Sequence, residues 1–476
     1  MKKKLKKEVM LMTKAFFVVA LIALTFASCA TTHNVVTFSA MGAAGTVPQD
    51  QRVPADTAIS LPGGEGLSMG DAIFSGWIRF ADGQATRYNP GVSFTPTENA
   101  RLMAHWKVEA DNLSEVRGLV NQLIWVMNNA ESNSTHIIEL NQDEVLPTER
   151  FDLFSYYNRE NITIILRGAG ENRTIRHAEQ GLPTLTQLIR FDAPTDPTMF
   201  TIFSGVSLVL ENITIEAHPP HSPIVSVWGN LTMNSGSVII GNAGTGVSVL
   251  RGGTLTMNDG ASITRVSGRG GTRERIEGGS RYPTRSGGIG VNLAGGTFTM
   301  NEGATISYNN EHGVSVGSAF AGSPPGTFIM HGGTIAANGG ARTAAAGALP
   351  PRVSGGGVAI YDGTFTMNGG SITYNAVQGF GGGVVVGVGS TVRGRNSTVV
   401  FNMAGGEITT NHAAGDGRTG GVAGGVLVHA GATFNMSGGN IANNIATRGG
   451  NNLEVLAPHG FGETAIVNTT GGSIQR

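Results

Sequence analysis

Two acidic residues occupy equivalent places in successive copies of a short motif. Asp259 follows Met257 by two residues, and Glu302 follows Met300 by two residues. If the two copies stack as neighbouring strands, the carboxylates lie about 5 Å apart, a separation that suits a bound cation or a catalytic dyad of carboxylates. The next copy has Gly332 at this place, so the acidic column is only two residues deep. We therefore favour an exposed turn pair over a metal site or a catalytic dyad.

A second segment with chemical potential is basic. Residues 265–285 contain six arginines against two glutamates. Guanidinium groups bind carboxylates, sulfates and phosphates through paired hydrogen bonds, so the segment is a candidate loop for binding anionic glycans or lipid headgroups. The residues assigned to this loop are Arg269, Arg273, Arg275, Arg281 and Arg285. The alternative is a solvated loop without a ligand, because lengthening a surface loop costs little free energy.

No other arrangement of residues points to catalysis. The histidines His312, His331, His412 and His429 share no motif position, and the chain contains neither an HExxH nor a GxSxG motif. We assign no catalytic residue, no metal ion and no cofactor. A non-catalytic protein is the prediction, and a polysaccharide lyase or glycoside hydrolase acting on acidic glycans is the alternative.

The N-terminus has the features of an export signal. Residues 1–14 are rich in lysine, and residues 15–27 are an apolar run too short to span a bilayer but typical of a signal peptide. The run leads into Cys29, the only cysteine of the chain, in a context that resembles a bacterial lipobox. The resemblance implies a signal peptide over 1–28 and a lipid on Cys29 that anchors the protein in the cell envelope, in the outer membrane or at the cell surface. Ordinary signal cleavage near this position is the alternative.

The rest of the chain is a sequence of tandem repeats with little charge. Glycine makes up 72 of 476 residues, and the part beyond Cys29 has a small excess of acidic residues, which disfavours a nucleic-acid partner. A motif of Phe or Leu, one residue, Met, a glycine turn and Ile recurs seven times. Its methionines are Met233, Met257, Met300, Met330, Met367, Met403 and Met436, and an asparagine usually follows the isoleucine by three residues.

The repeats predict a right-handed parallel β-helix over residues 135–476. Apolar residues at every second position share one face of a strand, and each repeat has three such short strands joined by glycine-rich corners. A single unit cannot bury its inner face, whereas stacked units form a continuous core. The seven motif methionines are expected to stack as one column in this core. The asparagines are expected either to form hydrogen-bonded ladders between layers or to occupy left-handed turns.

The residues before the β-helix form two further parts. Residues 29–34 are a short linker. Residues 107–134 contain an apolar pattern of helical spacing over 112–129, predicted to be a helix that caps the N-terminal end of the coil.

Residues 35–106 carry a distinctive set of short motifs. The motifs are a VTF strand, a glycine turn, Leu61-Pro62, a segment ending in Gly76-Trp77, YNPG-x-SFTPT and a final Trp106. Together they resemble the Listeria–Bacteroides repeat, also called the internalin-type B repeat. The resemblance implies a small β-grasp-like domain of cell-surface proteins without catalytic residues. Trp77 and Trp106 are expected in its core.

The repeat sequences, such as GGVAIYDGTFTMNGGSITYN, resemble those of bacterial surface proteins with pectin-lyase-like β-helices, similar to spirochaete-type lipoproteins and chlamydial polymorphic outer-membrane proteins. The resemblance implies an all-β surface lipoprotein whose rod presents loops for adhesion. Host proteins, matrix proteins or glycans are the expected partners, besides the membrane at Cys29. The sequence leaves the oligomeric state open.

Overall fold

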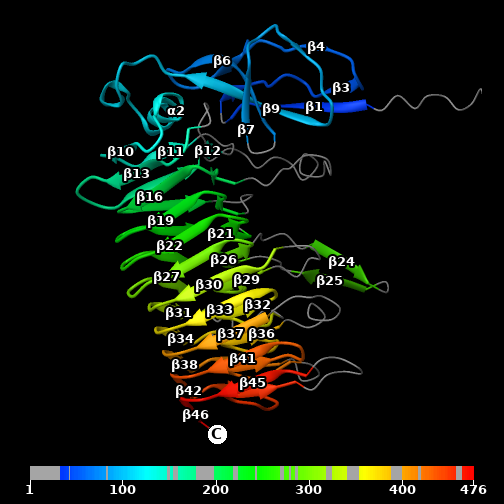
Figure 1. The fold of residues 1–476 in the computed structure, drawn as a ribbon, viewed down its shortest axis with the longest axis vertical. Helices are drawn as coiled ribbons and strands as arrows, with labels where there is room; N and C mark the ends of the chain where they lie inside the picture. The colour runs from blue at the N-terminus through cyan, green and yellow to red at the C-terminus, as the bar shows by residue number, and fades with distance from the viewer. Residues whose placement is uncertain are drawn as a thin grey trace, which may run out of the picture.

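The protein is a long rod with a small domain at one end (Figure 1). The computed structural model describes residues 33–41, 43–81, 84–146, 151–153, 159–177, 198–217, 223–241, 244–267, 273–277, 280–284, 288–317, 324–339, 353–387, 399–415, 420–456 and 464–475. The signal peptide and Cys29 lie outside the described residues, so the assignment of the lipid anchor stays a prediction.

The N-terminal domain is a mixed five-stranded sheet. In spatial order its strands are β3 (Gln51–Pro54), β1 (His33–Ser39), β9 (Ala100–Lys107), β6 (Ile73–Ala81) and β7 (Gln84–Tyr88). Only β1 and β9 run parallel. Two short antiparallel pairs complete the domain: β2 (Ala44–Gly45) with β5 (Leu67–Ser68), and β4 (Ile59–Ser60) with β8 (Ser93–Phe94).

Aromatic side chains form the core of this domain. Trp77 and Trp106 are fully buried, as predicted, and both indole nitrogens donate hydrogen bonds to backbone carbonyls. Phe74 contacts both indole rings edge to face, at centroid distances of 5.2 and 5.7 Å. The buried rings therefore hold the sheet together, and both polar N–H groups find partners.

One helix lies between this sheet and the first strands of the rod. The sequence predicts a helix over 112–129, but the structure divides this segment into a 3₁₀ turn, η1 (Leu113–Glu115), and an α-helix, α2 (Leu119–Asn129). The break falls at Gly118, whose φ of +78° is a left-handed conformation that ends helical geometry. The apolar face of α2 is buried at the junction.

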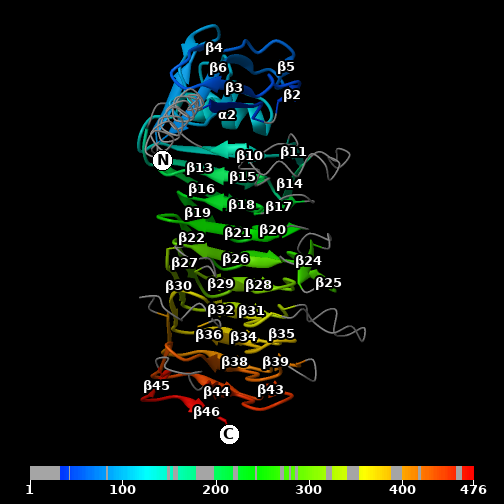
Figure 2. The ribbon, with the colours of Figure 1, turned by 90° about the vertical axis from the view of Figure 1, so that its right-hand side faces the viewer.

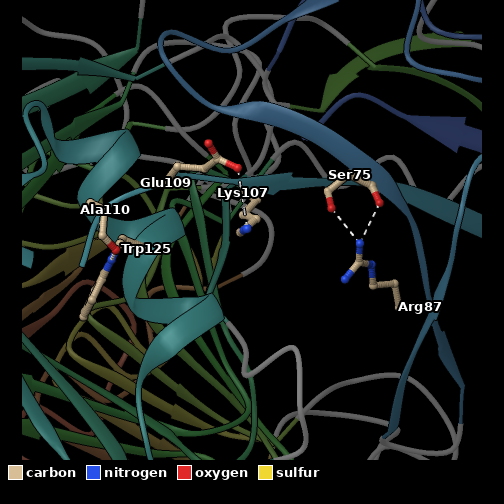
Figure 3. A network of polar contacts seen from close by, with 6 residues as sticks. All are labelled: Ser75, Arg87, Lys107, Glu109, Ala110 and Trp125. Atoms are coloured by element: carbon tan, nitrogen blue, oxygen red, sulfur yellow. Dashed lines mark hydrogen bonds and ion pairs between the residues drawn. The ribbon is translucent and has the colours of Figure 1, made fainter. Parts of the chain in front are cut away.

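Polar contacts fix α2 to the end of β9. Figure 3 shows the Trp125 indole nitrogen donating to the carbonyl of Ala110 at 3.0 Å, beside the Lys107–Glu109 ion pair. On the buried side, the Asn128 amide donates to the Trp106 carbonyl at 2.9 Å. The same view contains Arg87 of the N-terminal sheet, which donates to both the carbonyl and hydroxyl oxygens of Ser75.

The rod is a right-handed parallel β-helix with three long sheets, and one turn of the chain is called a rung here (Figures 1 and 2). The Phe–Met sheet contains the Phe-x-Met strands. Its strands are β10 (Thr135–Leu140), β13 (Ile162–Gly168), β16 (Val206–Glu211), β19 (Asn230–Met233), β22 (Thr254–Met257), β27 (Thr297–Met300), β30 (Gly326–Met330), β33 (Gly363–Met367), β37 (Val399–Met403), β41 (Thr433–Met436) and β45 (Ile466–Thr469).

The Ile sheet contains the isoleucines that follow the glycine turn. Its strands are β11 (Glu144–Leu146), β14 (Arg173–His177), β17 (Ile213–Ala217), β20 (Val238–Gly241), β23 (Ser262–Thr264), β28 (Thr305–Ser307), β31 (Thr334–Ala336), β34 (Ser371–Thr373), β38 (Glu407–Thr409), β42 (Asn440–Ala442) and β46 (Ser473–Ile474).

The third or Val sheet closes each rung. Its strands are β12 (Phe151–Leu153), β15 (Phe200–Ile202), β18 (Val225–Val227), β21 (Thr245–Leu250), β26 (Ile289–Ala294), β29 (Val314–Val316), β32 (Val358–Ile360), β36 (Val384–Val386), β40 (Val426–Val428) and β44 (Leu453–Val455). A short extra sheet joins β35 (Ala376–Val377), β39 (His412–Ala413) and β43 (Ile445–Ala446).

The inward side chains stack in register along the rod. The predicted methionine column is buried, and so are the isoleucine and valine columns beside it. Five phenylalanine rings lie face to face, with centroids 4.6–5.0 Å apart: Phe298, Phe328, Phe365, Phe401 and Phe434. This separation equals the strand spacing of a sheet, so identical residues at one register position pack directly on each other.

The asparagine column is a buried hydrogen-bonded ladder. The side-chain amide of Asn338 donates to Asn375 Oδ1 at 3.0 Å, and that of Asn375 donates to Asn411 Oδ1 at 2.9 Å. The left-handed residues are the ones just before the ladder, such as Tyr374 with φ +55°, and not the ladder asparagines. Of the two expectations for the column, the ladder is the one that the structure bears out.

Val266 occupies the position that an asparagine holds in the other repeats. It is buried, and its backbone N–H donates to Asn309 Oδ1 at 3.0 Å, so it supplies the first donor of the ladder. At the other end, the Asn444 amide donates to Asn452 Oδ1 at 2.9 Å. The ladder therefore extends to a residue that the motif spacing does not include.

Candidate functional site

The two acidic residues singled out by the motif lie at turns of adjacent rungs. Met257 of β22 pairs with Met300 of β27, which places Asp259 and Glu302 at the same position of successive turns. The Asp259 carboxylate lies over Gly303, because a β-carbon on that glycine would be 1.7 Å from Asp259 Oδ1. Both acidic residues are exposed to solvent.

A shallow depression of about 510 Å³ begins at Glu302 and continues over the next two rungs. Its polar side chains include Glu302, His331 and Ser371, and the rest of the lining is largely glycine and alanine. His331 Nδ1 lies 3.2 Å from the side-chain nitrogen of Asn368. One carboxylate and one imidazole thus border the same open surface, which suits contacts with a polar ligand.

Backbone packing explains why the acidic column ends at Glu302. A β-carbon on Gly332 would lie 2.8 Å from the Cα of Glu302, and one on Gly369 would lie 2.6 Å from the carbonyl oxygen of His331. Side chains at these two places would push neighbouring rungs apart. Glycine is therefore required where the turns approach most closely.

The four histidines named above lie in different surroundings. His312 is buried, with Nδ1 2.8 Å from the Gly355 carbonyl oxygen and Nε2 3.3 Å from the Tyr361 hydroxyl. Burial and the charge of Glu311 raise the pKa of Tyr361 to about 12, and burial lowers the pKa of His429 to about 4. His331 is at the depression, and His412 lies on β39. In the described part of the chain, no three His, Cys, Asp or Glu residues are grouped closely enough to hold a metal ion.

The basic segment forms a hairpin and not only a loop. Strands β24 (Arg273–Glu277) and β25 (Ser280–Thr284) pair antiparallel, with Arg275 opposite Tyr282 and Ile276 opposite Arg281. The hairpin projects sideways from the rod (Figure 1). Arg269 and Arg285 lie outside the described residues. The sequence signal for the hairpin is Gly278-Gly279 between two short polar segments, a dipeptide that favours tight hairpin turns.

Two exposed tyrosines are candidate binding residues that the motif analysis missed. Tyr308 follows β28 and is 45% exposed, and Tyr374 follows β34 and is 63% exposed. Each stands immediately before a ladder asparagine in the sequence, and this adjacency was the available signal. Their left-handed backbone, with φ of +58° and +55°, marks the corner at which the Ile sheet ends.

The predicted membrane anchor at Cys29 lies outside the described residues. Among the helical segments that the structure describes, none combines the length and the apolar character needed to cross a bilayer.

Comparison with known proteins adds no relative. No protein-family model, no curated protein and no solved structure matches the chain.

Proposed function

We propose that the protein is a non-catalytic, lipid-anchored bacterial surface protein whose β-helix is a rod that presents binding surfaces for adhesion or contact with the envelope. Cys29 is its acylation site, and the mature chain is exported to the outer membrane or the cell surface. The expected partners are host proteins, matrix proteins or glycans.

The continuous buried column of the rod is the observation that best supports this proposal. Every rung uses its inward side chains for packing, from Leu231 and Met233 to Phe434 and Met436. Ligands are therefore left with the outward faces, the corners and the β24–β25 hairpin. A stiff scaffold with exposed edges suits a role in presenting binding surfaces.

Glycan cleavage on the same scaffold is the second candidate. The adjacent positions of Asp259 and Glu302, with Glu302 and His331 at one depression, favour it. The test is the release of reducing ends or unsaturated products from acidic polysaccharides by the purified protein. Cleavage that is lost in Glu302→Gln would replace the non-catalytic proposal with this one.

The anchor is tested by mass spectrometry of the mature N-terminus. We expect a diacylglyceryl-modified Cys29 in the wild-type chain, and release of the Cys29→Ala protein from membranes into the soluble fraction. An unmodified N-terminus beyond residue 29 would refute the anchor.

Adhesion is tested with cells that display the anchored protein on immobilised matrix proteins and glycans. For the hairpin, Arg273, Arg275 and Arg281 are changed together to glutamine, and a triple lysine variant serves as the matched control. If the hairpin binds anions, the glutamine variant adheres less, and the lysine variant retains part of the binding because the charge is kept. Equal adhesion by all three proteins would exclude the hairpin, and absence of adhesion by the wild type would refute the adhesive role.

A further inference from the structure

The two exposed tyrosines belong to one column along the rod. Strands β28, β31 and β34 are neighbours in the Ile sheet, and Figure 2 shows them one below the other. Ser307 pairs with Ala336, and Ala336 pairs with Thr373. Tyr308, Ala337 and Tyr374 directly follow these residues, so they occupy the same corner position on three successive rungs.

The backbone holds this corner in a repeating geometry. The N–H of Tyr308 donates to the carbonyl of Ala336 at 3.2 Å, and the N–H of Ala337 donates to the carbonyl of Thr373 at 3.3 Å. All three corner residues have φ between +55° and +58°. The Cα–Cβ bonds of the three residues therefore leave the corner in equivalent directions, and the tyrosines stand two rungs apart, about 9.6 Å along the axis.

The small residue between the tyrosines separates two aromatic platforms. Ala337 projects only a methyl group, so a ligand that lies along the column contacts one ring, passes over Ala337 and contacts the second ring. In an extended β-1,4-linked glycan, alternate sugar rings recur at nearly this distance. Each ring presents an apolar C–H face that packs on an aromatic ring, which supplies apolar contact area at small cost in side-chain entropy.

Polar groups lie next to the platforms. The hydroxyls of Thr264 and Ser307 are 3.3 Å apart, and those of Thr373 and Thr409 are 3.5 Å apart. These residues lie on the Ile sheet directly before the corner column, and Ala336 separates the two hydroxyl pairs. One pair of hydroxyls therefore lies at the level of each tyrosine, and an aromatic ring beside hydroxyls matches the mixed apolar and polar surface of a neutral sugar chain.

We propose that Tyr308 and Tyr374 form a binding site for an extended β-1,4-linked glycan that lies along the rod axis, with two alternate sugar rings on the tyrosines and the ring between them over Ala337. The site supplies a ligand class for the adhesive role proposed above and rests on that role only for its biological setting. It requires neither the hairpin nor the anchor.

The test is calorimetric titration of the purified full chain with cello- and chito-oligosaccharides of two, three and six rings. Three rings are the fewest that reach both tyrosines, so the affinity is expected to rise about five- to tenfold from two rings to three. Tyr308→Ala and Tyr374→Ala each abolish this increase. The phenylalanine variants at the same positions retain it, because stacking does not need the hydroxyl.

Two controls distinguish binding at this site from non-specific binding of sugars. Trp228→Ala removes another exposed aromatic residue, 42% accessible, from a different corner, and is expected to leave the affinity unchanged. Maltohexaose has α-1,4 links and a curved chain that cannot follow the rod, so it is expected to bind at least about tenfold more weakly. Circular dichroism of each variant verifies that it is folded.

The inference is overturned if no β-1,4-linked oligosaccharide binds, if α- and β-linked chains bind equally, or if the double alanine variant of Tyr308 and Tyr374 binds like the wild type. If the purified wild-type protein binds the β-1,4-linked oligosaccharides but cells that display it do not adhere, the proposed function is refuted and the binding site still stands. Adhesion that persists in the double alanine variant, together with loss of purified-protein binding, would support the site and exclude it from the adhesive contact.

Discussion

Substitution of one ladder asparagine by leucine should destabilise the rod strongly. Asn375 is fully buried, and its side-chain nitrogen donates to the Ile335 carbonyl and to Asn411 Oδ1. Its side-chain oxygen accepts from both the backbone and the side-chain nitrogen of Asn338, each at 3.0 Å. Leucine has a similar shape and can make none of these four bonds.

The expected cost follows from the groups that remain in Asn375→Leu. Asn411 Oδ1 keeps the hydrogen bond from the backbone N–H of residue 375. Two N–H donors of Asn338 lose their acceptor in a dry interior, whereas the Ile335 carbonyl stays paired within the parallel ladder of β31 and β34. Each buried unsatisfied group costs about 1–3 kcal/mol, which gives roughly 2–6 kcal/mol. We expect about 2–4 kcal/mol, because leucine fills the volume and adds apolar burial.

The assay is equilibrium unfolding in urea, followed by circular dichroism, with Asn435→Leu as the matched control. Asn435 belongs to an outward ladder, where its side chain bonds Asn402 and Asn468 at 2.8 Å on the solvent side. Water replaces these bonds, so the control should lose less than about 1 kcal/mol. The reasoning is refuted if the two variants are equally stable, or if Asn375→Leu unfolds at the same urea concentration as the wild type.

Three further outcomes are expected. Phe365→Ala should lower the unfolding free energy by about 3–5 kcal/mol because it opens a cavity inside the ring stack, and a loss below about 1 kcal/mol would contradict that packing. Burial lowers the pKa of His105 and of His429 to about 4 from 6.5, with the charge of Arg87 adding to the effect at His105. As the pH drops from 6.5 to 4, these histidines are protonated in the unfolded chain before they are protonated in the folded one, so the stability of the fold decreases. The melting temperature of His105→Gln should therefore decrease less over this pH range than that of the wild type. Gly406→Ala, at φ +82° and with its new β-carbon 2.6 Å from Met367 Cε, should cost about 1–2 kcal/mol in the same urea assay, and an unchanged midpoint would contradict the strain.

The architecture could be predicted because its signals are local and repeated. Phe298 and Met300 stand two residues apart in a motif that returns seven times, so the inward face of the strand follows from period two alone. The alternation also places the isoleucine after the glycine turn in the core. Repetition lets a weak signal in one strand be checked against the equivalent strands.

Features that depend on the meeting of unlike segments could not be predicted. Asn452 enters the ladder eight residues after Asn444, outside the spacing of the motif. Gly118 interrupts an apolar pattern that otherwise continues as a helix, because a left-handed residue acts against the periodicity. The exposure of Tyr374 follows from the direction in which a corner projects, which becomes visible only when the three sheets are in place.

The exact cross-rung register makes the length of the rod adjustable. Met330 pairs with Met367, so these two residues are equivalent points on successive turns of the chain. If the chain between two such points is excised or duplicated, the remaining side chains still pack against residues at equivalent repeat positions. The length of the rod then changes by one strand spacing, about 4.8 Å. Unequal recombination between similar copies in the gene is therefore a route by which the distance between the N-terminal sheet and the far end can change in small steps while the interior stays the same.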